Sequence, residues 1–203
     1  MARQEKEVTK LQIELATIEL FGTQSYQNIS MDEIAKKAGV SKRTLYKYFP
    51  SKVELFISIF EQRLRQLITD EGTPMYEGMS FSDVLISQFT ALYEFTNEHV
   101  GFMKLFWMVN SDSFGSGTPA ELAEHVLLLN NRILENAAKQ LAEKTPTGIF
   151  KDMSPTLITQ MYSALNKGVF MQAEKEARIG IHTVTQDELF HAACDMLRRC
   201  AEQ

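Results

Sequence analysis

The sequence predicts an all-α protein, in which three short N-terminal helices precede a larger domain of six helices. Three observations lead to this prediction. Strict alternation of polar and apolar residues over the length of a strand is hard to find in the 203 residues. Four segments carry Ser or Thr followed three residues later by Glu, the capping box that opens a helix. The five prolines lie beside Gly, Ser or Thr clusters or at a helix start.

The first helix is expected over residues 6–21, with Gly22 at its end. Apolar side chains recur there at helical spacing and form its expected buried face: Val8, Leu11, Leu15 and Ile18. The capping boxes Ser30/Glu33 and Ser51/Glu54 open a second and a fourth helix. The second, third and fourth helices are expected at residues 31–38, 42–48 and 52–69, before a stop at Gly72 and Pro74.

The remaining helices are expected at residues 81–97, 100–110, 119–144, 155–177 and 186–199. The third helix of this group begins after the capping box Thr118/Glu121, and the last after Thr185/Glu188. Pro155 follows Ser154 at a first helical position, where its missing N–H costs nothing. Residues 102–108 are apolar on nearly every side, so the helix over 100–110 is expected to be buried.

Residues 31–48 have the pattern of two short helices packed across a tight turn. Gly39 supplies the positive φ of a helix C-cap, and the connection of residues 39–41 is too short for anything but a turn. Small or apolar side chains fill the wedge between the helices: Ile34, Ala35, Ala38, Val40 and Leu45. This pattern predicts a helix-turn-helix whose second helix turns its polar face outward.

Charge is unevenly distributed along the chain. The net charge is −5, but residues 1–55 hold nine Lys or Arg and seven Asp or Glu, a net of +2, which leaves 12 minus 19, or −7, for the rest. Residues 36–52 carry six cations and no acid, interleaved with Tyr, Ser and Thr. A solvated helix face can have this composition, but beside a helix-turn-helix it favours a surface for phosphates.

The segment SMDEIAKKAGVSKRTLYKYFPSKVELF, residues 30–56, resembles the N-terminal DNA-binding domain of the TetR family of bacterial transcriptional regulators. The resemblance covers residues 15–55, and beyond them only the length and helical character are similar. It implies a helix-turn-helix DNA-binding domain over residues 1–50 and a ligand-binding and dimerisation domain over 51–203. The implied function is a homodimeric, ligand-responsive regulator of the repressor type that binds palindromic, double-stranded operator DNA.

The same resemblance assigns the DNA contacts. Side chains expected on the recognition helix and against the major groove or its walls are Ser41, Lys42, Arg43, Thr44, Tyr46 and Lys47, while Ser30, Tyr48 and Lys52 would lie along the phosphates. Arg43 can pair with guanine through two hydrogen bonds, and Thr44 offers a methyl group to thymine. Packing against the first helix is the alternative for Tyr46 and Tyr48, whereas Phe49 is assigned to the core.

An effector pocket is implied among the helices of the second domain, because TetR-type C-terminal domains usually enclose one. Its candidate residues are Phe60, Phe89, Tyr93, Phe106, Trp107, Tyr162 and Asn166, each of which could instead be ordinary core. Aromatic and Met side chains adapt to flat or apolar molecules. Because no basic cluster marks an anionic site, the expected effector is hydrophobic, neutral or cationic, with Glu94 and Glu98 as possible partners of a cation.

The last two helices have two apolar faces each, one for the core and one for a partner. In the TetR family these helices of two subunits form a four-helix bundle. The implied dimer interface consists of Met161, Leu165, Gly168, Val169, Leu189, Ala192, Ala193 and Met196. Small residues among them would allow the helices to approach closely.

We find no constellation of catalytic residues, and we expect neither an enzyme nor a cofactor. His191 and Cys194 could supply two metal ligands, but a second pair is missing and a packed helix face explains both. The polar N-terminus and the two cysteines near the C-terminus favour a cytoplasmic protein that does not enter a membrane. A C-terminal domain that senses a protein partner is the alternative function; an exposed apolar patch elsewhere and no cavity would favour it.

Overall fold

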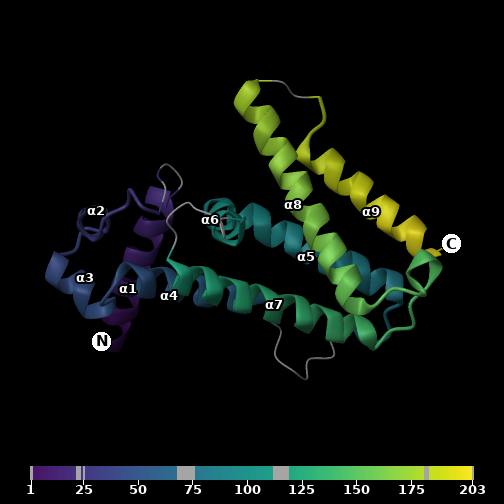
Figure 1. Cartoon of the computed structure of the whole chain (residues 1–203), viewed down its shortest axis with the longest axis horizontal. Coiled ribbons are helices and arrows are strands. Elements are labelled where there is room, and N and C mark those ends of the chain that lie inside the picture. Colours follow the sequence, from purple (N-terminus) through teal and green to yellow (C-terminus); the bar gives the residue numbers. More distant parts are fainter. Residues whose placement is uncertain are drawn as a thin grey trace. The chain divides into compact units, whose positions relative to one another are not determined.

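The computed structural model describes residues 2–21, 24, 26–67, 76–111, 119–180 and 183–202 (Figure 1). In these residues every regular element is a helix, which confirms the all-α prediction. The α-helices are α1 (Ala2–Phe21), α2 (Met31–Lys37), α3 (Lys42–Tyr48), α4 (Lys52–Leu64), α5 (Phe81–Glu98), α6 (Val100–Ser111), α7 (Ala120–Ala142), α8 (Pro155–Ile179) and α9 (Gln186–Glu202), with 3₁₀ turns η1 (Arg65–Leu67) and η2 (Gly148–Phe150).

The helix starts follow the expected caps closely. Ser30 Oγ accepts the backbone N–H of Glu33 at 3.2 Å, and the Glu33 carboxylate accepts the N–H of Ser30 at 2.9 Å. The same reciprocal pair joins Thr185 and Glu188 at 3.2 Å and 2.8 Å. Two separate capping boxes therefore fix the first turns of α2 and α9.

Other helix ends differ from expectation. At α4 the predicted cap is present, since Ser51 Oγ accepts the N–H of Glu54 at 3.1 Å. At α5 a capping box that was not predicted joins Ser80 and Asp83, whose shorter carboxylate takes the place of Glu. The fourth helix ends at Leu64 and tightens into η1, earlier than predicted. Residues 68–69, the stops at Gly22, Gly72 and Pro74, and the cap at Thr118 lie outside the described residues.

The predicted buried face of α1 is wrong for three of its four residues, and the fourth, Ile18, is half-buried. Val8, Leu11 and Leu15 are 55%, 41% and 42% exposed. A second series at helical spacing is buried instead and comprises Ile13, Ala16, Thr17 and Phe21. Both series satisfy the helical period, and the buried one was selected by packing, since α2 and α6 lie against α1.

The chain divides into two compact units. The first consists of residues 1–66 and 99–130, and the second of residues 67–98 and 131–203, so the helix α7 belongs to both. The unit that holds α2 and α3 thus includes α4 and α6 as well. The functional division at residue 50 stays a prediction.

Each unit has its own core. In the first, Phe56 packs edge-on against Phe21 and Tyr26, with ring centroids 5.8 Å and 4.9 Å away. The expected burial of residues 102–108 holds for Phe102, Met103, Leu105, Phe106 and Trp107, while Met108 is exposed. In the second, the core includes Phe81, Leu85, Phe89, Leu141, Phe150, Ile158 and Leu197.

The described residues can be searched for membrane-spanning helices and for clusters of metal ligands. None of the helices in the described part of the chain is long and apolar enough to cross a membrane. His191 directs Nδ1 at the carbonyl oxygen of Asp187, 2.7 Å away on its own helix. No group of three or more potential metal ligands occurs among the described residues.

Candidate nucleic-acid interface

The turn between α2 and α3 is built by glycine and by backbone hydrogen bonds. Gly39 has φ +67°, a conformation that favours glycine over other residues. The N–H of Val40 returns to the carbonyl of Ala35 at 3.0 Å, which closes the end of α2. Ile34 and Leu45 are completely buried and Ala35 nearly so. The two helices therefore pack as the sequence predicts for a helix-turn-helix.

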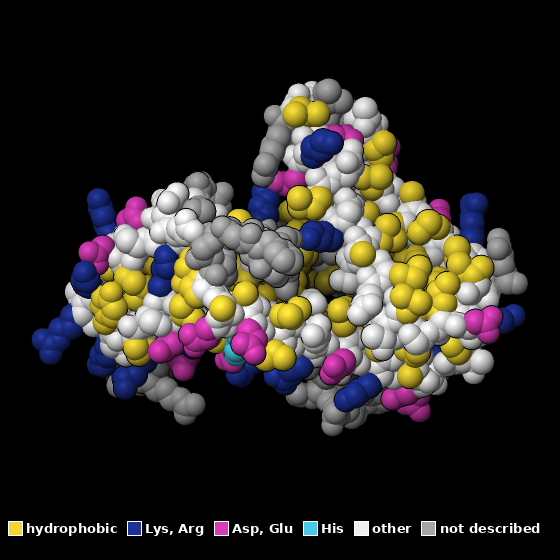
Figure 2. All heavy atoms as spheres, in the orientation of Figure 1, with side chains coloured by type: hydrophobic (Ala, Val, Ile, Leu, Met, Phe, Trp, Pro, Cys, Tyr) yellow, Lys and Arg dark blue, Asp and Glu magenta, His cyan; other side chains and the backbone are white. Residues whose placement is uncertain are grey.

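Burial of Leu45 turns the opposite face of α3 to solvent. Lys42, Arg43, Tyr46 and Lys47 are exposed, and Thr44 and Tyr48 are half-buried. Phe49, assigned to the core from the sequence, is buried. Figure 2 shows Lys and Arg side chains projecting around the end of the first unit that carries α2 and α3.

Hydroxyl groups at the start of α3 are engaged with one another. Ser41 is the N-cap, and its Oγ accepts the N–H of Thr44 at 3.0 Å. The hydroxyls of Ser41 and Thr44 also share a hydrogen bond of 2.8 Å. Ser30 has the equivalent capping role in α2. Ser30 and Ser41, which are both predicted to contact DNA, thus cap the N-termini of α2 and α3.

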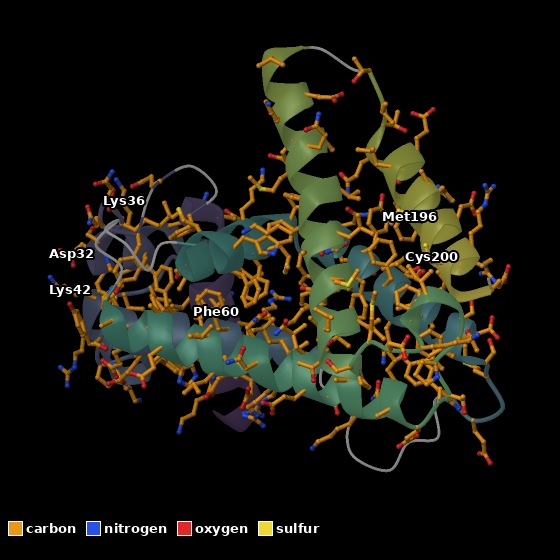
Figure 3. The ribbon with its side chains drawn as sticks, turned by 45° about the vertical axis from the view of Figure 1, so that its right-hand side comes forward. Asp32, Lys36, Lys42, Phe60, Met196 and Cys200 are labelled. Carbon is orange, nitrogen blue, oxygen red and sulfur yellow. The ribbon has the colours of Figure 1, made fainter. Side chains whose placement is uncertain are left out.

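Two lysines of the basic segment form ion pairs within the unit. Lys42 Nζ lies 2.7 Å and 3.0 Å from the two carboxylate oxygens of Asp32, and these residues occupy one end of the unit in Figure 3. The hydrogen bond to Asp32 raises the pKa of Lys42 above its ordinary value. Lys37 Nζ lies 2.9 Å from a carboxylate oxygen of Glu19. Both pairs are exposed, so each contributes little to stability.

Lys52 has partners that the sequence did not suggest. Its Nζ donates to the carbonyl oxygens of Tyr26 at 2.6 Å and Ile29 at 2.8 Å. It also lies 4.0 Å from the centroid of the Tyr26 ring. Partial burial lowers the pKa of Lys52, and burial raises the pKa of Tyr26 to about 12. The expected phosphate ligand is therefore held by backbone groups of its own unit.

The candidate effector residues fall in both units. Phe60, Phe106 and Trp107 are buried in the first, where the rings of Phe60 and Phe106 are 6.2 Å apart; Figure 3 labels Phe60. Phe89, Tyr93, Tyr162 and Asn166 are buried in the second. The sequence therefore identified buried positions, but in two separate cores.

In the second unit these candidates meet a residue that sequence reasoning left out of the site. Phe190 stacks on Tyr93 with ring centroids 3.8 Å apart and on Phe89 at 5.4 Å. Tyr93 donates its hydroxyl to Asp187 at 2.6 Å. Phe89 also contacts Tyr162, edge-on, at 6.5 Å. Helices α5, α8 and α9 thus share one aromatic cluster.

Polar groups cross this apolar interior at two levels. Tyr162 donates to Gln88 Oε1 at 3.3 Å, and Asn166 Nδ2 donates to the Thr96 hydroxyl at 3.0 Å. Sequence reasoning missed Gln88 and Thr96, because their partners on α8 are 74 and 70 residues away along the chain. Asn166 Oδ1 is buried and has no hydrogen-bond partner among the described residues.

The candidate dimer residues divide between surface and core. Met161, Gly168, Ala192 and Met196 are exposed, and Figure 3 labels Met196 on α9. Leu165 and Leu189 are half-buried, and Val169 and Ala193 are buried within the unit, so these two offer little surface to a partner. The exposed side of α8 also carries Leu157, Ala164 and Met171.

Residues 15–59 match the model of a family described as bacterial regulatory proteins, tetR family. These residues contain the helix-turn-helix described above. Among curated proteins, the HTH-type transcriptional regulator YhgD of Bacillus subtilis is 27% identical over 167 residues, which are 82% of this chain and 84% of that protein. The similarity to YhgD thus extends well beyond the DNA-binding segment.

Solved structures share the fold over nearly the whole chain. The MbdR regulator from Azoarcus sp. CIB aligns with a TM-score of 0.74 at 17% identity, covering 95% of this chain and 98% of that chain. The transcriptional regulator FadR from Bacillus subtilis, in complex with stearoyl-CoA, aligns with a TM-score of 0.62 at 20% identity, covering 92% and 96%. Both likenesses concern the fold.

Proposed function

Because the chain belongs to the TetR family of DNA-binding transcriptional regulators, we propose that it is a repressor that releases operator DNA when a small, hydrophobic effector binds. The exposed face of α3, held outward by the burial of Leu45, is the observation that carries this proposal. In it, residues 1–50 read a palindromic operator, and residues 51–203 bind the effector and a second subunit.

The DNA contacts follow from chemistry and exposure. Arg43 pairs with guanine, and Tyr46 and Lys47 contact bases or the groove wall. Tyr48 and one of the two linked hydroxyls of Ser41 and Thr44 donate to phosphate oxygens. Ser30 lies along the phosphates but donates its hydroxyl proton to Glu33 at 2.9 Å, and Lys42 is drawn to phosphate in competition with Asp32. Ser41 and Thr44 lie at the N-terminus of α3, whose dipole favours the same anions.

A homodimer through α8 and α9 is supported by their exposed apolar side chains. Leu157, Met161, Ala164, Gly168 and Met171 recur every three or four residues along the exposed side of α8. Apart from its chain neighbours and the nearby backbone of α8, no heavy atom of the described residues comes within 4 Å of the position that a Cβ would take at Gly168, so a second helix can approach there. Ala192 and Met196 extend this surface on α9, and such a two-fold dimer matches a palindrome.

Effector binding is proposed in the cluster of Phe89, Tyr93, Tyr162 and Asn166, with Phe60, Phe106 and Trp107 as further candidates. The aromatic rings suit an apolar molecule, and FadR from Bacillus subtilis binds an acyl-CoA, stearoyl-CoA, in a similar fold. The unpartnered Oδ1 of Asn166 would accept a hydrogen bond from a hydroxyl or N–H group of the effector.

Release needs no chemical reaction. If the effector binds best to a conformation in which the two α3 helices no longer match successive major grooves, its binding lowers operator affinity. A coupling free energy of about 1–3 kcal/mol corresponds to a loss of about 5- to 150-fold.

A C-terminal domain that senses a protein partner is the second candidate. It is favoured by two apolar side chains of residues 51–203 that are exposed outside α8 and α9, Leu127 and Leu128 on α7. Under this alternative, substitution of Leu127 by Glu removes the response to the partner, whereas effector sensing is unaffected by it.

The direct test is an electrophoretic mobility shift with the DNA upstream of the protein's own gene, titrated with salt. We expect a specific complex whose log–log salt slope falls by about 1 for each phosphate-contacting cation removed. Arg43→Ala should cost about 1–3 kcal/mol and relax base preference at one position. Affinity that is equal for all sequences, or absent, would reject DNA regulation by this chain.

Dimerisation is tested separately by sedimentation. Met161→Glu places a charge in the proposed interface and should yield monomers. Leu128→Glu makes the same kind of change at an exposed apolar residue of α7 and should leave the dimer intact. Monomers from both variants, or from neither, would contradict the α8 and α9 interface.

A further inference from the structure

Lys52 is the first residue of α4, and its ammonium group has three partners within the first unit, although the residue is only half-buried. Two hydrogen bonds run to the carbonyl oxygens of Tyr26 at 2.6 Å and Ile29 at 2.8 Å. The Tyr26 ring lies 4.0 Å from Nζ. An ammonium group has three donors, so two carbonyls and one π face account for its whole binding capacity.

The acceptors of these bonds lie at the other end of the helix-turn-helix. Ile29 immediately precedes Ser30, the N-cap of α2, and Lys52 immediately follows Ser51, the N-cap of α4. The two residues are 23 apart in sequence. The side chain of Lys52 thus joins the first turn of α4 to the residue just before the N-cap of α2.

We propose that Lys52 is a positioning residue, a clasp that fixes α4 to the start of α2, and that it is not a phosphate ligand. Through this clasp, a displacement of the first turn of α4 is passed directly to the helices that read DNA. The inference rests on the proposed function, but its first test can be read without DNA.

Competition between the two roles favours the clasp. To reach a phosphate, the ammonium of Lys52 must give up two charge-assisted hydrogen bonds and a cation–π contact. It would gain one contact at a solvent-exposed surface, where salt screens the attraction. Lys47, by contrast, is exposed on α3 and faces no such loss.

Reductive methylation of lysines, followed by mass spectrometry, distinguishes these roles in the wild-type chain. A clasped Lys52 reacts at least about 10-fold more slowly than Lys47 in the free protein, because reaction requires the clasp to open. Operator DNA then protects Lys47 and leaves the rate at Lys52 unchanged. Equal rates in the free protein, or protection of Lys52 by DNA, would overturn the proposal. Loss of Lys47 protection alone would count against the proposed DNA surface and not against the clasp.

Matched variants extend the test to binding. Lys52→Met should lower operator affinity about 10-fold while the salt slope and the affinity for unrelated DNA stay the same, because no phosphate contact is lost. Lys47→Met should lower the slope by about 1 on both DNAs. Lys52→Arg should restore operator affinity, since guanidinium can also donate to both carbonyls.

If Lys52→Met lost affinity equally for operator and unrelated DNA and had a lower salt slope, Lys52 would be a phosphate ligand. Unchanged operator affinity of this variant would show that DNA binding does not depend on the clasp. Thermal unfolding of Lys52→Met confirms that binding is measured on folded protein. If this variant does not fold, the methylation rates of the wild-type chain decide.

Discussion

The side-chain amide of Asn166 on α8 donates to the hydroxyl of Thr96 on α5 at 3.0 Å. Thr96 donates its own proton to the carbonyl oxygen of Leu92 at 2.7 Å, so it can only accept from Asn166. This arrangement fixes the orientation of the amide, with Nδ2 on Thr96 and Oδ1 buried without a partner among the described residues. This oriented hydrogen bond joins the two helices, in addition to the one from Tyr162 to Gln88.

Replacement of Thr96 by Val removes the acceptor and keeps the shape of the side chain. The amide of Asn166 is then left with a buried donor, so the free energy of unfolding should fall by about 1–3 kcal/mol. Urea denaturation measures it. In a double-mutant cycle with Asn166→Ala, the two losses should not add, and strict additivity would mean that the hydrogen bond contributes nothing.

Gly148 and Gly180 have similar backbone conformations but different surroundings, so alanine substitutions at the two positions can be compared. Their φ angles are +59° and +68°, so alanine is strained at both. A Cβ at Gly148 would overlap the carbonyl oxygen of Cys200, whereas no described residue beyond the chain neighbours lies within 4 Å of a Cβ at Gly180. Gly148→Ala should therefore cost about 2 kcal/mol more than Gly180→Ala in urea denaturation. Equal costs would show that η2 moves freely away from α9.

Glu14 should make stability depend on pH in an unusual direction. It is buried on α1, accepts the Ser58 hydroxyl at 3.0 Å and lies 3.7 Å from Lys10 Nζ. Burial is the largest influence and raises its pKa. Folding therefore favours the protonated form, so the charged carboxylate lowers stability once the pH exceeds the unfolded pKa of about 4.3.

The variant Glu14→Gln removes this cost. Its free energy of unfolding relative to the wild type should rise between pH 4 and pH 7, and the difference should level off above the folded pKa. Chemical denaturation across this range measures it. A relative stability that falls with pH would mean that attraction to Lys10 exceeds the desolvation of the carboxylate.

Asp32 holds Lys42 and adds negative charge to the proposed DNA surface. Asp32→Asn should raise affinity for operator and unrelated DNA alike and increase the salt slope by up to about 1. Stability should change by less than about 1 kcal/mol, because the pair is exposed. Glu135→Gln makes the same change of charge on the second unit and should leave both DNA affinities unaltered. An unchanged slope in Asp32→Asn would mean that Lys42 does not contact phosphate.

Local signals in the sequence were sufficient for the helices and the helix-turn-helix. A capping box such as Ser30 with Glu33 involves atoms only three residues apart, and Gly39 meets a backbone requirement that glycine fulfils best. The buried face of α1 was beyond such signals, because two apolar series share the helical period and only packing against α2 and α6 selects between them.

In the candidate site, the sequence likewise predicted which side chains are exposed but not their long-range partners. Exposure of Arg43 and Lys47 follows from burial of Leu45, two residues away from each. The partners of Lys52 and Asn166 depend on the approach of segments 23 and 70 residues away, and a periodic pattern carries no information about such contacts. A lysine at the start of α4 therefore suggested a phosphate ligand, whereas long-range packing supplies Lys52 with the carbonyl oxygens of Tyr26 and Ile29.

The hydrogen bond between the hydroxyls of Ser41 and Thr44 limits what the tip of α3 can offer to a polyanion. Phosphate oxygens only accept, so each hydroxyl contact consumes a proton from the protein. The two side chains possess one hydroxyl proton each, and their mutual bond takes one of them. One proton remains to be shared by the pair, so either hydroxyl can bind a backbone oxygen of DNA, but both can do so only if their mutual hydrogen bond breaks.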